Sequence, residues 1–167
     1  MTTPSENLCL ACGLCCDGTL FSWVVLRPAD DVPRLAEAGV AAETVNGRQG
    51  LWQPCAGHHA GRCTVYQVRP CACATFRCKL LRRQEAGEIA PDQARAVVER
   101  ARQFRDIVRA HTGSARSGTS LRAAFWEAWK IAEATATPAV RISFAALQWI
   151  LDREFRDAPA SSDEPLV

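Results

Sequence analysis

The sequence is poor in patterns typical of membrane spans and of secretory signals, and we expect neither in this chain. No apolar run approaches the 18 or more residues that a membrane-spanning helix requires. The opening residues, MTTPSENLCLACG, have neither the basic cap nor the apolar stretch of a secretory signal. We therefore expect a cytoplasmic protein without a membrane partner, in a reducing compartment where disulfides are rare.

Common catalytic motifs are also missing. The sequence has no phosphate-binding glycine loop, no G-x-S-x-G elbow, no H-E-x-x-H pair and no dinucleotide fingerprint. It has no large excess of either charge, because 20 basic residues accompany 18 acidic ones. This near balance does not favour nucleic acid as a partner.

Cysteine is absent beyond Cys78, although nine cysteines lie up to that point. An odd number fits complete disulfide pairing poorly, and clustered thiols in a reducing compartment more often bind metals or react. The distribution divides the chain by chemistry. It predicts a cysteine-cluster metal-binding domain over residues 8–88 and a helical region over 89–157, with flexible termini at 1–7 and 158–167.

The region without cysteine is predicted to form three helices. Apolar residues recur at three- and four-residue spacing from Pro91 to near Gly113, again after Ser120, and at about residues 143–156. The last two helices carry three tryptophans, Trp126, Trp129 and Trp149. Aromatic side chains on such helices are expected to fill the core between them.

The cysteine-rich part is predicted to be irregular. TLFSWVVLRP has the β-branched and aromatic content of a short strand, and ADDVPRLAEAG predicts a short helix that stops at Gly39. ETVNGRQGLWQPC predicts a hairpin that turns at Asn46-Gly47. The expected fold class is α+β, a small irregular cysteine-rich metal-binding domain packed on a three-helix C-terminal bundle.

The stretch Cys9-Leu-Ala-Cys12-Gly13 has the spacing of a metal knuckle. Two intervening residues let both sulfurs approach one ion, and the glycine permits a left-handed turn. Cys15 continues the spacing into C-x2-C-x2-C, a run that also presents three thiolates to an iron–sulfur cubane. Side chains of neighbouring residues diverge, so Cys15 and Cys16 are expected to serve two metals, or only one of them to bind.

The remaining ligands would come from later cysteines, and there the pattern becomes specific. C-x2-C-G-x-C-C is followed by PC, by G-x-C-x-x-Y-x-x-R-P-x-x-C and by F-x-C. This combination resembles the YkgJ-type cysteine-cluster family, a zinc- or iron-chelating domain to which the flagellin lysine N-methylases are related. The matching positions are Cys9, Cys12, Gly13, Cys15, Cys16, Cys55, Gly61, Cys63, Tyr66, Arg69, Pro70, Cys73, Phe76 and Cys78.

The resemblance implies a centre of zinc or iron, the iron alone or as an iron–sulfur cluster. Eight cysteines suit two four-thiolate sites, or one iron–sulfur cluster with additional ligands or a zinc ion beside it. The candidate ligands are Cys9, Cys12, Cys15, Cys16, Cys55, Cys63, Cys73 and Cys78. Cys71 is an additional thiol that we treat as spare, and Ala74 stands where the family often has arginine.

Three functional hypotheses follow from these residues. The first is a metal-binding protein whose zinc or iron organises the fold. The second is an iron–sulfur-dependent enzyme of methyl-transfer or redox type. The third is an adaptor with structural zinc, whose C-terminal helices bind a partner protein.

For the other polar residues near the cysteines, the sequence allows two interpretations of each side chain's role. Arg69, between Tyr66 and Pro70, could donate hydrogen bonds to an anionic metal centre or bridge loop carbonyls. His58 and His59 could ligate metal, but with eight cysteines available both are expected to face water.

A stripe of arginines also marks the first predicted helix. Arg95, Arg102 and Arg109 recur at seven-residue spacing, which could meet phosphate or an acidic partner. Acidic residues interrupt the stripe. We expect it to be a solvated face with local ion pairs.

Overall fold

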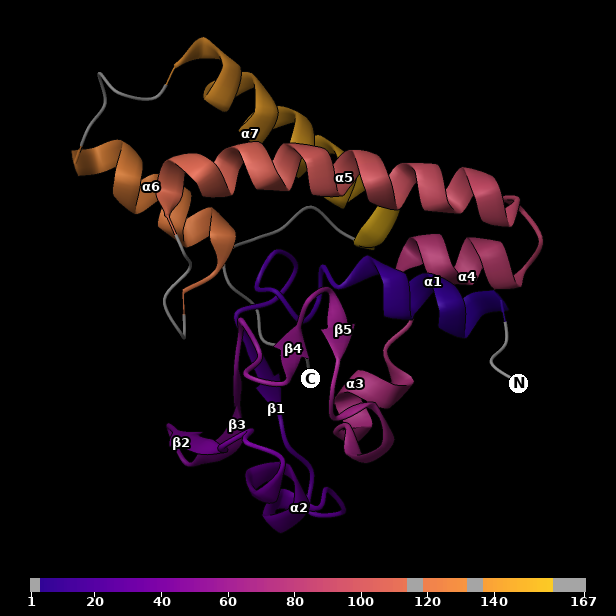
Figure 1. The fold of residues 1–167 in the computed structure, drawn as a ribbon, viewed down its shortest axis with the longest axis vertical. Helices are drawn as coiled ribbons and strands as arrows, with labels where there is room; N and C mark the ends of the chain where they lie inside the picture. Colours follow the sequence, from indigo (N-terminus) through magenta and orange to yellow (C-terminus); the bar gives the residue numbers. More distant parts are fainter. Residues whose placement is uncertain (1–3, 114–118, 132–136, 158–167) are drawn as a thin grey trace. The chain divides into compact units, whose positions relative to one another are not determined.

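The computed structural model describes residues 4–113, 119–131 and 137–157 (Figure 1). The predicted flexible end at 158–167 and residues 1–3 lie outside this part of the chain. The described residues form two compact units. The helical unit includes residues 4–12, 77–113, 121–131 and 137–157. The sheet unit is built mainly from residues 13–76.

This division differs from the one that cysteine content indicates. The predicted boundaries, 8–88 and 89–157, put every cysteine in one domain and remain a prediction. In the structure, the chain instead passes from the helical unit to the sheet unit between Cys12 and Gly13. It returns to the helical unit between Phe76 and Arg77. The α+β fold class is confirmed, because several helices accompany two small sheets.

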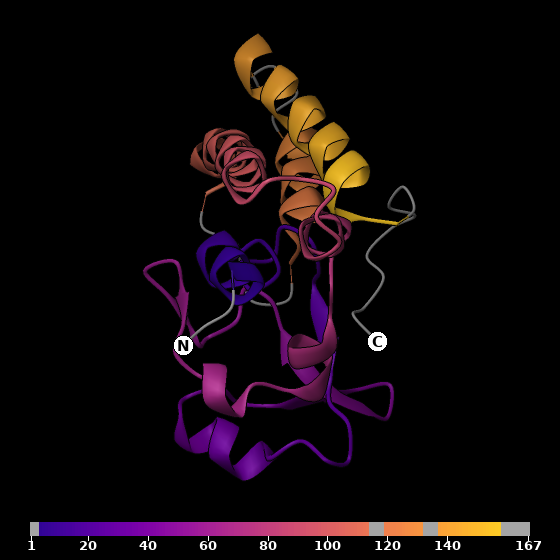
Figure 2. The ribbon, with the colours of Figure 1, turned by 90° about the vertical axis from the view of Figure 1, so that its right-hand side faces the viewer.

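In its described residues, the helical unit has helices as its regular elements. Its elements are α1 (Pro4–Cys12), α4 (Lys79–Glu85), α5 (Pro91–Thr112), α6 (Leu121–Ile131), α7 (Pro138–Ile150) and a wider π-helical turn, Leu151–Phe155. α5 packs against α1, α4, α6 and α7. Figure 2 views α5 and α1 nearly end-on, so their axes run close to parallel.

Apolar residues at helical spacing explain why α5 and α7 pack together. Val98, Ala101 and Val108 of α5 are buried, as are Phe144 and Leu147 of α7. Residues three or four apart lie on one face of a helix, so each helix presents a continuous apolar stripe.

Two helix starts differ from the sequence prediction. α7 begins at Pro138 instead of about residue 143, because the Thr137 side chain caps it and proline suits the first turn of a helix. α1 begins at Pro4 and takes in residues that the sequence placed in a flexible terminus. The predicted end of α5 near Gly113 is confirmed.

The tryptophan prediction is wrong for two of its three residues. Trp126 is 45% exposed and Trp149 is 59% exposed, whereas Phe125 and Phe144 are buried. The buried phenylalanines stack with ring centroids 3.7 Å apart and fill the space that the tryptophans were expected to occupy. The side chain of Trp129 lies outside the described residues.

The sheet unit holds a three-stranded antiparallel sheet in the order β1-β3-β2. Its elements are β1 (Trp23–Val25), α2 (Val32–Glu37), β2 (Glu43–Val45), β3 (Arg48–Trp52), β4 (His58–His59), β5 (Arg62–Cys63), a 3-10 turn (Tyr66–Val68) and α3 (Cys71–Thr75). The predicted strand, helix and hairpin are confirmed. β2 and β3 meet at Asn46-Gly47, where both residues have positive φ.

The core of the sheet unit is small and apolar. It contains Val24, Leu26, Leu35, Val40, Leu51, Val65 and Ala72. Leu35 has no exposed surface and Leu51 has 2%. Across the described residues of both units, no helix is long and apolar enough to cross a lipid bilayer.

Candidate metal centre

The two units divide the eight candidate ligands. Cys9, Cys12 and Cys78 lie in the helical unit, and Cys15, Cys16, Cys55, Cys63 and Cys73 lie in the sheet unit. None of the nine described cysteines is joined in a disulfide. Cys9 is exposed, and the other eight cysteines are half-buried.

In the helical unit, two helix ends present the thiols. Cys9 and Cys12 occupy the last turns of α1, and Cys78 is the residue that caps the start of α4. The Cys78 Sγ accepts a hydrogen bond from the Leu81 backbone N–H at 3.4 Å. Burial raises the pKa of Cys78, and the nearby Cys9 raises it further. The hydrogen bond from the Leu81 N–H lowers this pKa but does not cancel the shift.

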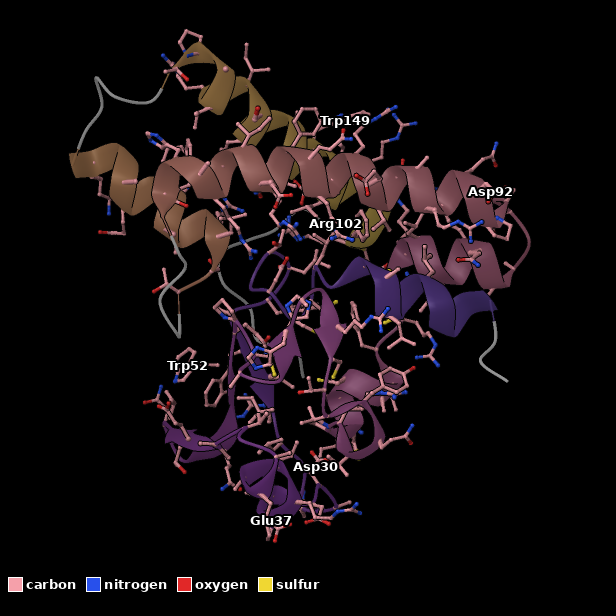
Figure 3. All side chains as sticks on the ribbon, viewed as in Figure 1. Asp30, Glu37, Trp52, Asp92, Arg102 and Trp149 are labelled. Carbon is pink, nitrogen blue, oxygen red and sulfur yellow. The ribbon has the colours of Figure 1, made fainter. Side chains whose placement is uncertain are left out.

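Arg102 of α5 ties the Cys9–Cys12 segment of α1 to α5. Its Nη1 donates a hydrogen bond to the backbone carbonyl of Ala11 at 3.0 Å, and Figure 3 labels its side chain. The last carbonyls of a helix have no partner within the helix, and a cation there also suits the helix dipole. The prediction of a solvated face with local ion pairs is confirmed for Arg95, which is exposed and pairs with Asp92. Arg102 instead has a structural role.

Replacing Arg102 with methionine should destabilise the helical unit by about 1 kcal/mol, because a hydrogen bond from a charged group to a helix carbonyl is lost. Denaturant unfolding followed by far-UV circular dichroism measures this change. Arg95→Met is the matched control on the same helix, and it should leave the midpoint unchanged. Equal midpoints for both variants would show that the Ala11 contact adds no stability.

In the sheet unit, three thiols gather at the apolar core. Cys55, Cys63 and Cys73 pack against the core cluster. Burial raises the pKa of all three, and it raises that of Cys73 to about 12 with the help of Cys55 and Cys63. The three thiols therefore lie within one another's electrostatic field and stay protonated near neutral pH when no cation is bound.

A turn after Cys12 holds the next two cysteines against Cys55. The N–H groups of Cys16 and Asp17 both donate to the Gly13 carbonyl at 3.0 Å. The Cys16 carbonyl accepts from the N–H of Cys55 at 2.8 Å. These bonds fix the backbone around Cys15 and Cys16 beside the loop that carries Cys55.

Asp30 positions α3, the helix that carries Cys71 and Cys73. Its two carboxylate oxygens accept hydrogen bonds of 2.7 Å, one from the Arg27 N–H and one from the Cys71 N–H. Figure 3 labels the Asp30 side chain. Burial raises the pKa of Asp30, but these donors outweigh it and the net shift is downward. Sequence reasoning missed this residue, because a contact spanning 41 positions leaves no local signal.

Arg69 takes the second of its two predicted roles, because it donates a hydrogen bond to a loop carbonyl. Its Nη1 donates to the Tyr66 carbonyl at 2.8 Å, and its guanidinium carbon lies 3.6 Å from the centroid of the Tyr66 ring. The stacking holds a positive charge close to two thiols, since Arg69 lowers the pKa values of Cys63 and Cys73 against the effect of burial. Arg69 thus bridges a loop carbonyl and also favours thiolates nearby.

The two histidines differ, and the prediction that both face water is wrong for His58. His59 is exposed, but His58 is half-buried and its Nε2 atom is buried. The imidazole lies against Gly13, where a Cβ atom would be 2.8 Å from Nε2. A side chain at position 13 would therefore crowd the ring.

The donor set suits a thiophilic metal. Thiolates and imidazole are soft or borderline ligands that zinc and iron accept, and no disulfide competes for the sulfurs. In the part of the chain that the structure describes, no three His, Cys, Asp or Glu side chains are already arranged to hold an ion.

Thiol spacing, sulfur chemistry and the buried cluster together define a metal-chelating domain. A family model matches residues 8–100, more than half of the chain; it is CxxCxxCC, described as a "putative zinc- or iron-chelating domain". The chain belongs to this family, and the match extends beyond Cys78 into α5. Searches of curated proteins and of solved structures found no match.

Proposed function

We propose that the chain binds zinc or iron through its eight family-matching cysteines. Cys9, Cys12 and Cys78 serve in the helical unit, and the five others serve in the sheet unit. The observation that carries the proposal is the cluster of Cys55, Cys63 and Cys73, three thiols packed beside an apolar core. Cys63 raises the pKa values of both Cys55 and Cys73.

The charge of this cluster depends on whether a cation is bound. Burying ionised groups without compensation is unfavourable, and here burial keeps the thiols neutral. A bound cation reverses the balance, because each thiol that coordinates it gives up its proton. Metal affinity should therefore rise with pH, and Arg69 should offset part of the thiolate charge.

The residues support binding more directly than catalysis. Zinc held by four thiolates would contribute folding free energy, whereas an iron–sulfur centre would supply electron transfer or substrate coordination. Asp30 and Arg102 hold ligand-bearing segments in place through hydrogen bonds to the backbone. A cytoplasmic location belongs to the same proposal, because it keeps the nine cysteines reduced.

Metal analysis of the full chain, purified without oxygen, tests the proposal. We expect stoichiometric zinc or iron, measured by elemental analysis together with a thiol count under denaturing conditions. A metal-free protein that takes up neither zinc nor iron on reconstitution would contradict it.

The same preparation separates the alternatives. Visible thiolate-to-iron absorption with acid-labile sulfide would favour the iron–sulfur enzyme, and a colourless zinc protein would remove that hypothesis. The adaptor hypothesis, with a protein partner on the C-terminal helices, remains a prediction.

A further inference from the structure

The position of His58 sets it apart from His59, the next residue in the chain. It opens β4 and pairs with Cys63 of β5 across the two-stranded sheet. Directly opposed residues of an antiparallel pair have Cβ atoms about 4.5–5.5 Å apart and point to the same side. The imidazole of His58 and the thiol of Cys63 therefore share one face of this sheet.

The backbone of His58 links it to a second cysteine. Its N–H donates to the Cys55 carbonyl at 2.9 Å, so the turn that carries Cys55 leads straight into β4. The N–H of Cys55 in turn donates to the Cys16 carbonyl. His58 thus belongs to the same hydrogen-bonded framework that places three of the candidate ligands.

The ring of His58 lies against the cysteine run itself. Nε2 is the ring atom nearest to where a Cβ of Gly13 would be, at 2.8 Å, and Cε1 follows at 3.2 Å. The Gly13 carbonyl also accepts the hydrogen bond from the Cys16 N–H. The nitrogen is therefore buried beside the turn that leads to Cys15 and Cys16.

We propose that Nε2 of His58 is a metal donor in the sheet unit, which makes its ligand set mixed sulfur and nitrogen. This inference rests on the proposed chelation and adds a ligand that the cysteine pattern does not include. Imidazole is a regular ligand of zinc and iron, and sites with three cysteines and one histidine are a common zinc class. His59, exposed and one residue away, takes no part.

Cadmium-113 is the probe, because it replaces zinc in thiolate sites and couples magnetically to its ligand atoms. The full chain, labelled with nitrogen-15 at histidine and loaded with cadmium-113, is studied by long-range proton–nitrogen NMR. We expect the Nε2 resonance of His58 to show cadmium coupling and the resonances of His59 to show none. This readout uses the wild-type protein and does not depend on the folding of a variant.

Two substitutions add an affinity measurement. His58→Ala should weaken zinc binding by at least about 10- to 100-fold. This is the loss that follows when a residue that only supports a ligand is replaced, and a ligand itself should matter no less. His59→Ala should leave zinc affinity unchanged. Bound cadmium coupled only to cysteines would overturn the inference and leave chelation by the cysteines intact, whereas a chain that takes up no metal would overturn both.

Discussion

Replacing Cys73 with serine is expected to lower zinc affinity by about 100-fold or more. Changes to residues that merely support a ligand already cost about 10- to 100-fold, and serine offers a hydroxyl that does not ionise near neutral pH. Cys73 lies at the centre of the thiol cluster, since both Cys55 and Cys63 raise its pKa. A competition titration with a chromophoric chelator measures the change.

Cys71→Ser is a matched control, because Cys71 shares the short helix α3 with Cys73. Cys71 is the thiol outside the family pattern. Its backbone N–H donates a hydrogen bond to Asp30, and a serine at this position keeps that donor. Its replacement should leave zinc affinity unchanged. Equal losses in the two variants would mean that the set of eight ligands is wrong, and circular dichroism of both metal-free variants shows whether α3 and the rest of the fold survive.

Local sequence signals predicted much of the fold. Asn46-Gly47 marked the hairpin because both residues tolerate positive φ, which the tight turn between β2 and β3 requires. The apolar spacing after Pro91 marked α5, and its end near Gly113 followed from the same pattern. These features depend on residues close in sequence, so a single chain reveals them.

Contacts between distant residues were beyond such reasoning. Cys9 and Cys12 have knuckle spacing, yet they lie on the last turns of α1, a helix that the cysteine pattern concealed. The Arg102 bond to Ala11 joins residues 91 positions apart, and nothing in the arginine stripe distinguishes Arg102 from Arg95. The assignment of neighbouring cysteines to two compact units likewise depends on how the whole chain packs.

The candidate site was predictable in its chemistry and less so in its surroundings. Spacing selected the eight cysteines, and the charge of thiolates made an arginine near Cys63 and Cys73 reasonable before its place was known. His58 was expected in water, because sequence gives no sign that its ring would lie on Gly13. That position depends on β4 pairing with β5 and on the turn at Cys16.

Replacing Gly50 with alanine should destabilise the sheet unit by about 3 kcal/mol, the upper part of the usual range for overpacking. Gly50 lies in β3, the central strand. A Cβ atom there would lie 2.4 Å from two ring carbons of Trp23 and 2.5 Å from the Val24 carbonyl oxygen. The ring could turn away, but the carbonyl belongs to the paired backbone of β1 and cannot move without breaking the sheet.

Urea unfolding of the metal-free full chain, followed by tryptophan fluorescence, measures the effect. Gln49→Ala, an exposed neighbour on the same strand, is the control and should shift stability by less than about 0.5 kcal/mol. Because β3 supports the core against which Cys55, Cys63 and Cys73 pack, a metal bound to the folded sheet unit should offset the loss. Zinc at about 1,000 times its dissociation constant adds about 4 kcal/mol to the folded state by mass action, enough to restore Gly50→Ala to the metal-free wild-type level. Matching midpoints for Gly50→Ala and Gln49→Ala without metal would contradict the packing argument, and a deficit that zinc leaves unchanged would place the metal outside the sheet unit.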